Sequence, residues 1–273
     1  MAKSDTKYWE RRRGKIFNRK GGWKVGQGVY CHGYEIMTDL VGNISYVQMM
    51  MLNITGTLPS RKVADCVEAI YVTMSWPEPR IWCNHIGALS GTAKTGVVGA
   101  TTAGVLAADS TMYGSRPLLE SVTFIKKALE DYQSGKSIQE IVDEQIKLHQ
   151  GKVQIVGFAR PLVRGDERVA AVQKTMAAHN IEIGPHLDLA YKIADHLRNR
   201  HGEDININGF SAAFLSDVGL SKEQIYSLAA MCVVSGVTAC YLEEYDKPAE
   251  SFLPLRCEDI DYQGPPPREV PDP

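Results

Sequence analysis

The sequence lacks a strong net charge. Its 273 residues carry a formal net charge of −2, and the pI is near 6.4. A chain this close to neutrality has no overall field that would gather nucleic acid or an anionic membrane. The one basic run, around Arg11–Arg13, is typical of a solvated surface. We therefore expect a small-molecule partner rather than nucleic acid or a membrane.

Paired cysteine motifs and long hydrophobic runs are also missing. The six cysteines form no C-x-x-C pair, and no apolar leader precedes the first lysines, so we expect reduced thiols in the cytoplasm. The weakly polar run Thr95–Ala108 lacks a charge but is too short, and too rich in glycine and threonine, to span a bilayer. The histidines have no metal-ligand spacing, so we predict no metal.

The composition that is present indicates an ordinary globular chain. With 44% hydrophobic and 23% charged residues, it can bury a core large enough for one large domain or two coupled ones. Two short apolar runs, Ile16–Phe17 and Val25–Tyr30, predict a small β-ribbon that turns at Arg19–Gly22.

Helical periodicity dominates the rest of the sequence. Capping residues and apolar spacing predict helices beginning after Ser60, near Leu118, after Ser137, at Asp166, at Pro185 and after Ser221, the last running to Glu244. A glycine-spaced segment, Ile86–Ala108, is expected where backbones pack closely, in the core or across a subunit interface. Within it, Gly91–Thr95 fails as a phosphate loop because no glycine directly precedes Lys94. The proline-rich tail from Gly264 predicts an extended arm.

Three polar segments, of which the middle one begins with glycine, follow the layout of an active site. They are Met112–Ser115, Gly157–Arg168 and Asp204–Ala213. Their order and spacing resemble the citrate synthase superfamily, most closely its short citryl-CoA lyase-like branch. Lys7–Glu10 near the start and Tyr262–Pro266 near the end extend the resemblance over nearly the whole chain.

The resemblance implies a mainly α, citrate synthase-like two-domain helical fold with a small N-terminal β-ribbon. Residues 1–115 and 215–273 would form the large helical domain, and residues 116–214 the small one. The site would lie in the cleft between them and be completed by domain closure. The resemblance also implies a homodimer or higher homo-oligomer, with coenzyme A bound as a thioester substrate.

The resemblance implies that this sequence has other residues at the positions where the family has its catalytic residues. Tyr113 and Arg160 stand where the family has histidines, and Asn208 stands where it has the aspartate that removes a proton. A later carboxylate-binding arginine of the family falls near Val233, whereas Arg168 keeps its place in an Asp-x-Arg pattern.

The replacements suit oxygen binding better than proton transfer. An asparagine amide cannot take a proton at neutral pH, so Asn208 removes a general base worth about 10²–10⁴-fold in rate. Arg160 stays protonated and can hold a carboxylate or an oxyanion, and Tyr113 can donate to a thioester oxygen.

Further candidates follow from the same segments. We expect Arg168, Asn206 and His85 to bind substrate, and Lys152 and Arg164 to meet the phosphates of coenzyme A. If a general base stands at a position other than that of the family's aspartate, the candidates are Glu203, Asp204, Asp166 and His85.

Two classes of function remain open. The first is an enzyme that breaks or forms a carbon–carbon bond in an acyl-CoA or related carboxylate with a non-standard active site, or a hydrolase or decarboxylase on the same fold. The second is a catalytically silent paralogue that binds a ligand or a partner. The polar character of all three replacements favours the enzyme.

Overall fold

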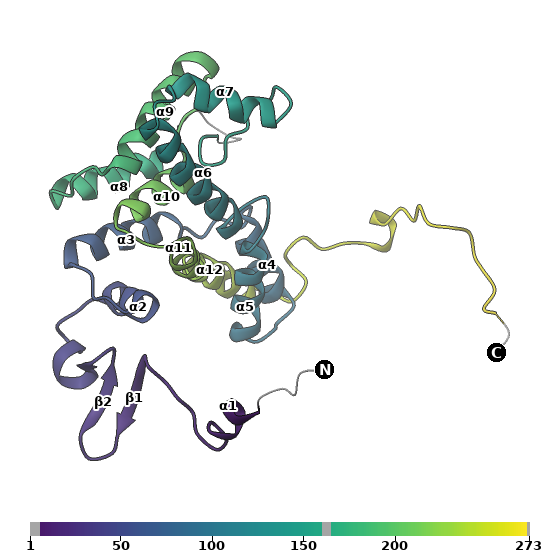
Figure 1. The fold of residues 1–273 in the computed structure, drawn as a ribbon. Coiled ribbons are helices and arrows are strands. Elements are labelled where there is room, and N and C mark those ends of the chain that lie inside the picture. Colours follow the sequence, from purple (N-terminus) through teal and green to yellow (C-terminus); the bar gives the residue numbers. More distant parts are fainter. Residues whose placement is uncertain (1–5, 160–164, 272–273) are drawn as a thin grey trace.

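A computed structural model describes residues 6–159 and 165–271 and shows a mainly helical chain (Figure 1). The N-terminal part comprises α1 (Lys7–Glu10), β1 (Gly21–Lys24), β2 (Gly28–Cys31), β3 (Tyr34–Glu35) and the π-helical turn η1 (Ile36–Leu40). The helices that follow are α2 (Tyr46–Thr55), α3 (Arg61–Thr73), α4 (Trp82–Thr92), α5 (Val97–Ala108), α6 (Ser115–Gln133), α7 (Ile138–Leu148), α8 (Glu167–Ala178), α9 (Pro185–His201), α10 (Ile207–Asp217), α11 (Lys222–Ala229) and α12 (Val234–Tyr245). A 3₁₀ turn, η2 (Cys257–Asp259), lies in the C-terminal arm. The predicted mainly α class with a small N-terminal β-ribbon is confirmed.

The β-ribbon exists, but the predicted positions of its first strand and its turn were wrong. Strands β1 and β2 pair antiparallel, with Trp23 opposite Val29, and β3 adds to the edge of β2. The turn falls at residues 25–27, where Gly26 takes a positive φ of 76° that favours glycine. Gly21 belongs to a strand because its missing side chain lets it lie against the carbonyl of Tyr30. Ile16 lies outside the sheet and is 98% exposed.

The segment Ile86–Ala108 is not one helix. It is divided between α4 and α5 by a reversal in which Lys94 takes a left-handed φ of 57°. The Lys94 ammonium donates to the carbonyl of Glu244 at 3.3 Å, and also to the carbonyls of Tyr245 and Lys247. Lys94, which lies in the segment rejected above as a phosphate loop, therefore caps the C-terminus of α12, where carbonyl groups lack helical partners.

Three glycines let α12 approach α4 and α5 closely, as expected of this segment. A Cβ added at Gly87 would overlap the carbonyl of Val237, and one at Gly91 the carbonyl of Tyr241. A Cβ at Gly104 would overlap the Val237 side chain. Helices α4, α5 and α12 thus share a small core built on Cys83, Ala108, Val233 and Val237.

Most helix starts were predictable because their caps are local. The Ser60 hydroxyl accepts from the Val63 N–H, and Ser137 with Glu140 forms a reciprocal capping box. Ser221 and Gln224 form another. The long helix predicted from there to Glu244 is instead interrupted by a turn at residues 230–233.

By length and composition alone, the stretch Lys222–Tyr245 is long and apolar enough to cross a membrane. Part of the stretch is nevertheless buried in the protein: Ile225 and Leu228 of α11 pack in the main core, and Val237 of α12 packs in the smaller one. Met231 and Leu242 are about half exposed.

The main core surrounds α10. Every residue from Gly209 to Ser216 in α10 is buried, together with Ile207, and α10 packs against α6, α8 and α9. The same core continues into α2, α3 and α11, with Met51 and Val67 among its members. In Figure 1, α6 to α10 form the upper part of the molecule and α2 to α5 the lower part. The division at 115/116 and 214/215 stays a prediction.

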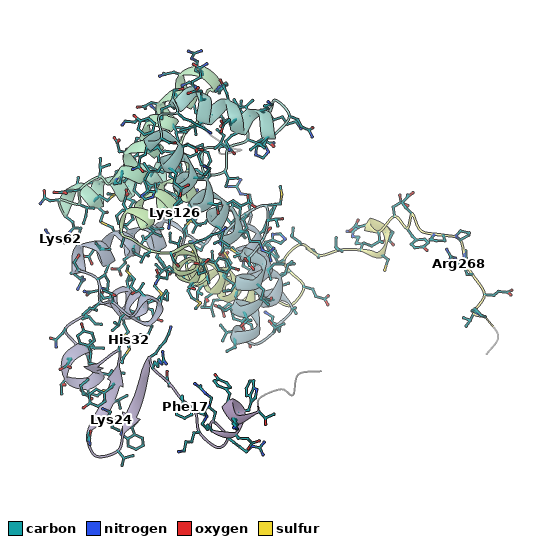
Figure 2. The ribbon with its side chains drawn as sticks, viewed as in Figure 1. Phe17, Lys24, His32, Lys62, Lys126 and Arg268 are labelled. Carbon is teal, nitrogen blue, oxygen red and sulfur yellow. The ribbon has the colours of Figure 1, made fainter. Side chains whose placement is uncertain are left out.

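The two ends of the chain project from this body. Figure 2 shows Phe17 and Lys24 on the N-terminal segment and Arg268 far along the C-terminal arm. From Leu253 to Pro271 every described residue is exposed, and the only regular element is η2, so the predicted extended arm is confirmed.

The glycine contacts give a matched stability test. We expect Gly91→Ala to destabilise the protein by about 1–3 kcal/mol, because its Cβ has to displace the α12 backbone. Gly99→Ala, on α5 with no atom within 4 Å of its Cβ, should stabilise by up to about 1 kcal/mol through helix propensity. Urea unfolding followed by circular dichroism measures both, and equal effects would contradict the packing argument.

Candidate active site

A narrow cavity lies where α3, α6, α10 and the α11–α12 turn meet. Its volume is about 40 Å³. It is lined by Val67, Ile70, Tyr71, Met74, Ala108, Gly114, Ser115, Leu118, Ile207, Asn208, Ser211, Leu215, Ile225, Leu228, Ala229, Cys232 and Val233. The cavity therefore brings together residues from the first and third of the three polar segments, Met112–Ser115 and Asp204–Ala213.

The N-terminus of α10 forms one wall and is fixed by backbone contact. A Cβ on Gly157 would lie 2.8 Å from the Cα of Gly209, so the two glycines let the loop and the helix touch. The carbonyl of Gly157 accepts from the Asn206 N–H at 2.9 Å. This contact explains why the second segment begins with a glycine, since Gly157 also takes a positive φ of 91°.

Asn206, predicted to bind substrate, caps this helix. Its side-chain oxygen accepts from the backbone N–H groups of Asn208 and Gly209, at 2.9 and 3.1 Å. Its amide nitrogen donates to the carbonyl of Ala159 at 2.7 Å. Both ends of the side chain are thus used to hold α10 and the loop in place, and a contact with substrate stays a prediction.

The Asp166–Arg168 pair fastens α8 to the same helix end. The Arg168 guanidinium binds the Asp166 carboxylate through two hydrogen bonds, at 2.8 and 2.7 Å. The carboxylate also accepts from the Ile207 N–H at 2.9 Å. The third guanidinium nitrogen lies 3.3 Å from the sulfur of Met74, which lines the cavity. Arg168 therefore lies at the edge of the cavity, with its guanidinium group already bound to the Asp166 carboxylate.

The Asp166 carboxyl has a lowered pKa. Burial alone would raise it, but the hydrogen bonds and charge of Arg168, with the N–H groups of Ile207 and Arg168, outweigh burial and stabilise the anion. Asp166 therefore stays ionised as a structural anchor, which makes it a poor displaced base.

The N-terminus of α6 forms the opposite wall. Gly114 precedes it with φ 85° and ψ −132°, a conformation that favours glycine, and a Cβ there would overlap the Ala108 carbonyl. No side chain caps α6 at this position. The first N–H groups of a helix have no partner within it, so this end carries partial positive charge toward the cavity.

Three polar side chains line the cavity between the two helix ends. They are Ser115, which is 7% exposed, Ser211, which is 4% exposed, and the half-buried Asn208. Within the described residues, neither serine hydroxyl nor the Asn208 side-chain amide has a hydrogen-bond partner. Ser211 lies three residues after Asn208, on the same face of α10. The lining thus carries hydrogen-bond donors that could serve a ligand oxygen.

Sequence reasoning placed Asn208 at the site but missed the two serines as functional residues. The signal for Ser211 was its i+3 spacing from Asn208, and that for Ser115 was its position directly after Gly114. Val233 lies in the lining at 3% exposure.

Tyr113 turns away from this cavity. Its hydroxyl lies 2.6 Å from the sulfur of Cys83, and its ring packs edge-on against Trp82. Burial and the Cys83 thiol raise its pKa well above the ordinary value, so it stays protonated. Burial, together with Cys83, also raises the pKa of the cavity-lining Cys232 thiol to about 12. Neither group is an available base.

His85 and Lys152 lie outside the lining. The His85 Nδ1 lies 3.0 Å from the Pro79 carbonyl, and its ring packs against Phe252. Lys152 is exposed in the loop after α7. Arg160 and Arg164 fall outside the described residues.

The other candidate bases have structural contacts or remain untested. Asp204 pairs with Arg198 at 2.9 Å, and its carboxylate accepts from the Ile205 N–H at 2.8 Å. Glu203 is absent from the cavity lining. In the part of the chain that the structure describes, no aspartate, glutamate or histidine lines the cavity, and no group of three such residues or cysteines could hold a metal ion.

No protein-family model and no curated protein matches this sequence, but solved structures do. Citryl-CoA lyase from Hydrogenobacter thermophilus superposes with a TM-score of 0.79 and 24% identity, over 94% of this chain and 98% of that one. ATP citrate lyase from Methanothrix soehngenii superposes with a TM-score of 0.74 and 16% identity, over 92% of this chain and 42% of that one. Citrate synthase from Thermoplasma acidophilum superposes with a TM-score of 0.63 and 16% identity, over 83% of this chain and 59% of that one. The chain therefore has the citrate synthase-like fold.

Charge removal at Asp166 gives a pH-dependent test. The folded-state pKa lies below the unfolded value near 3.9, so the stabilisation is present above that pH and lost as the pH falls through the folded value. We expect Asp166→Asn to lose about 3 kcal/mol at pH 7, because it leaves the Arg168 charge unpaired, and less near pH 3.

Urea unfolding at both pH values measures the difference from the natural protein. Asp188→Asn, which removes an exposed carboxylate paired with Lys192, is the control and should change little. A loss from Asp166→Asn that is the same at pH 3 and pH 7 would argue against the ion pair.

Proposed function

We propose that this protein breaks or forms a carbon–carbon bond in an acyl-CoA or a related carboxylate, with a non-standard active site. The observation that carries the proposal is the cavity between the α6 and α10 N-termini, which Ser115, Ser211 and Asn208 line without partners among the described residues. The fold supports it, since the similar ATP citrate lyase structure holds citrate and coenzyme A.

Oxygen binding is the chemistry that this arrangement supports. Carbon–carbon cleavage or formation beside a thioester places negative charge on the thioester oxygen as the enolate develops. Helix N-termini and fixed hydroxyl or amide donors stabilise such charge most strongly in an apolar setting that excludes water. In this proposal, Ser115 and Ser211 donate to the thioester oxygen and Asn208 holds it from the α10 side.

The proton must be moved by something other than a cavity-lining acid or histidine. Asn208 cannot accept a proton at neutral pH, and the thiol of Cys232 stays protonated. We propose that a carboxylate of the substrate, or water, takes this part. A decarboxylation would need no base to generate the enolate, so a decarboxylase is the second candidate favoured by the lining.

The other predicted residues have narrower roles in this proposal. Arg168 and Asn206 hold the α10 end that carries Asn208, and Tyr113 becomes a donor only if its hydroxyl exchanges Cys83 for the ligand. We keep Arg160 as a carboxylate anchor, and Lys152 and Arg164 as partners of the coenzyme A phosphates. His85 stays a proposed substrate contact that domain closure would have to bring in. The six free cysteines agree with a cytoplasmic protein.

Binding of acetyl-CoA tests the proposal. We expect Ser211→Ala and Ser115→Ala each to weaken its affinity roughly 5- to 10-fold, because each removes one hydrogen bond to the thioester oxygen. Ser216→Ala is the matched control, since it is a buried serine of α10 whose hydroxyl is also unpaired in the described chain but lies outside the cavity. Isothermal titration measures all three, and an equal effect of Ser216→Ala would contradict the assignment. A silent binding paralogue would give the same affinities but no turnover of any acyl-CoA.

We also propose that the protein is a homodimer, paired through α5. This helix carries no charged residue, yet Val98 is 77% and Leu106 is 71% exposed. Apolar helix faces of this kind are normally covered.

Leu106→Glu should convert the dimer to a monomer, because it buries a charge in that interface. Leu148→Glu, an equally exposed leucine at the end of α7, should leave the dimer intact. Light scattering after size-exclusion chromatography gives the mass, and a monomeric natural protein at micromolar concentration would refute the proposal.

A further inference from the structure

We infer that a groove between α6 and α7 binds a small zwitterion, namely a free α-amino acid with an apolar side chain. The inference goes beyond the proposed function and does not rest on it, because the groove shares no described lining residue with the cavity between α6 and α10. In Figure 1 both helices of the groove lie in the upper part of the molecule.

The groove has the dimensions of a small-molecule site. Its volume is about 460 Å³, and such sites usually enclose about 300–1,000 Å³. Its walls come from α6, from α7 and its C-cap residue His149, from Val156 in the following loop, and from Lys222 at the start of α11. Glu120, Lys127 and His149 are exposed, so a ligand can enter from solvent.

Apolar side chains form one part of the lining. Ala128 and Ile141 are buried, and Phe124 and Val156 are half-buried. The Phe124 ring packs edge-on against the buried Phe158, with the ring centroids 5.9 Å apart. An apolar group of a ligand therefore meets hydrocarbon and an aromatic ring, and its burial there favours binding.

Several charged side chains of this region are paired with one another. The Lys127 ammonium lies 2.8 Å from the Asp131 carboxylate. Lys136 bridges Asp131, at 3.4 Å, to Glu144, at 2.8 Å. Two ammonium groups thus balance two carboxylates, and these pairs tie the end of α6 to α7.

Glu120 and Lys222 are charged lining residues that are available to a ligand. Within the described chain neither side chain has a hydrogen bond or an ion pair, with the other or with a third residue. They stand on different helices, α6 and α11, and carry opposite charges. A ligand with both an ammonium and a carboxylate can pair with both, through charge-assisted hydrogen bonds. A free α-amino acid carries these two groups beside one apolar side chain.

Titration calorimetry of the full-length protein with phenylalanine tests the inference. Three analogues each lack one feature: glycine has no apolar side chain, N-acetylphenylalanine has no ammonium, and phenylalaninamide has no carboxylate. We expect phenylalanine to bind roughly tenfold more tightly than each analogue, because each analogue loses one favourable contact.

Two charge-removing variants tie this preference to the groove. Glu120→Gln should lower the ratio of the phenylalanine affinity to the N-acetylphenylalanine affinity roughly fivefold, because it removes the partner of the ammonium. Lys222→Met should lower the ratio of the phenylalanine affinity to the phenylalaninamide affinity by a similar factor, because it removes the partner of the carboxylate. Since neither side chain has a hydrogen bond or an ion pair to lose within the described chain, both variants should fold.

The matched controls are Glu130→Gln, on an exposed position of α6, and Lys62→Met, on an exposed position of α3 (Figure 2). Both residues lie outside the lining, so both ratios should stay unchanged.

Three results would overturn the inference. They are a failure of phenylalanine to bind, an analogue that binds as tightly as phenylalanine, and affinity ratios that change no more in Glu120→Gln and Lys222→Met than in the controls. These measurements involve no acyl-CoA, so the proposed function is tested separately by the binding of acetyl-CoA.

Discussion

The close contact between Gly157 and Gly209 is the constraint on which the site depends. With no side chain on either residue, the loop backbone lies against the first turn of α10, and the Gly157 carbonyl accepts the Asn206 N–H. That contact fixes the position of the first turn of α10 against the Gly157 loop. Asn208 and Ser211 take their positions in the cavity from it, because both side chains project from the anchored turns of one helix.

Buried charge reinforces this backbone contact. The Asp166 carboxylate joins the N-terminus of α8 to the Ile207 N–H of α10, and the Arg168 fork offsets the cost of burying it. On the opposite wall the N-terminus of α6 has no side-chain cap. One helix end is thus capped and held, while the other has no side-chain cap, and the cavity between them is lined by hydrogen-bond donors.

Local sequence signals predicted most of the fold. Capping boxes at Ser137 and Ser221 depend on residues three positions apart, so they are readable without tertiary information. The positions of the β-ribbon strands depended on which glycines form the turn and which pair across strands, and the periodicity of a single sequence does not distinguish these. The break at residues 230–233 has no proline or glycine to mark it.

The site was predictable in part, for a similar reason. Asn208 follows a recognisable N-cap, so its place at the start of α10 could be inferred from sequence. The turn of Tyr113 toward Cys83 joins residues 30 positions apart, and no local pattern reports it. The apolar walls come from four helices and the α11–α12 turn, so the character of the cavity emerges only when they are packed together.

The most direct test of the account is a crystal structure with a non-hydrolysable ketone analogue of acetyl-CoA. The account predicts the carbonyl oxygen within about 3 Å of the Ser115 and Ser211 hydroxyls and the Asn208 amide, with the methyl group against the aliphatic walls. A carbonyl oxygen bound away from the two helix ends would contradict the central claim.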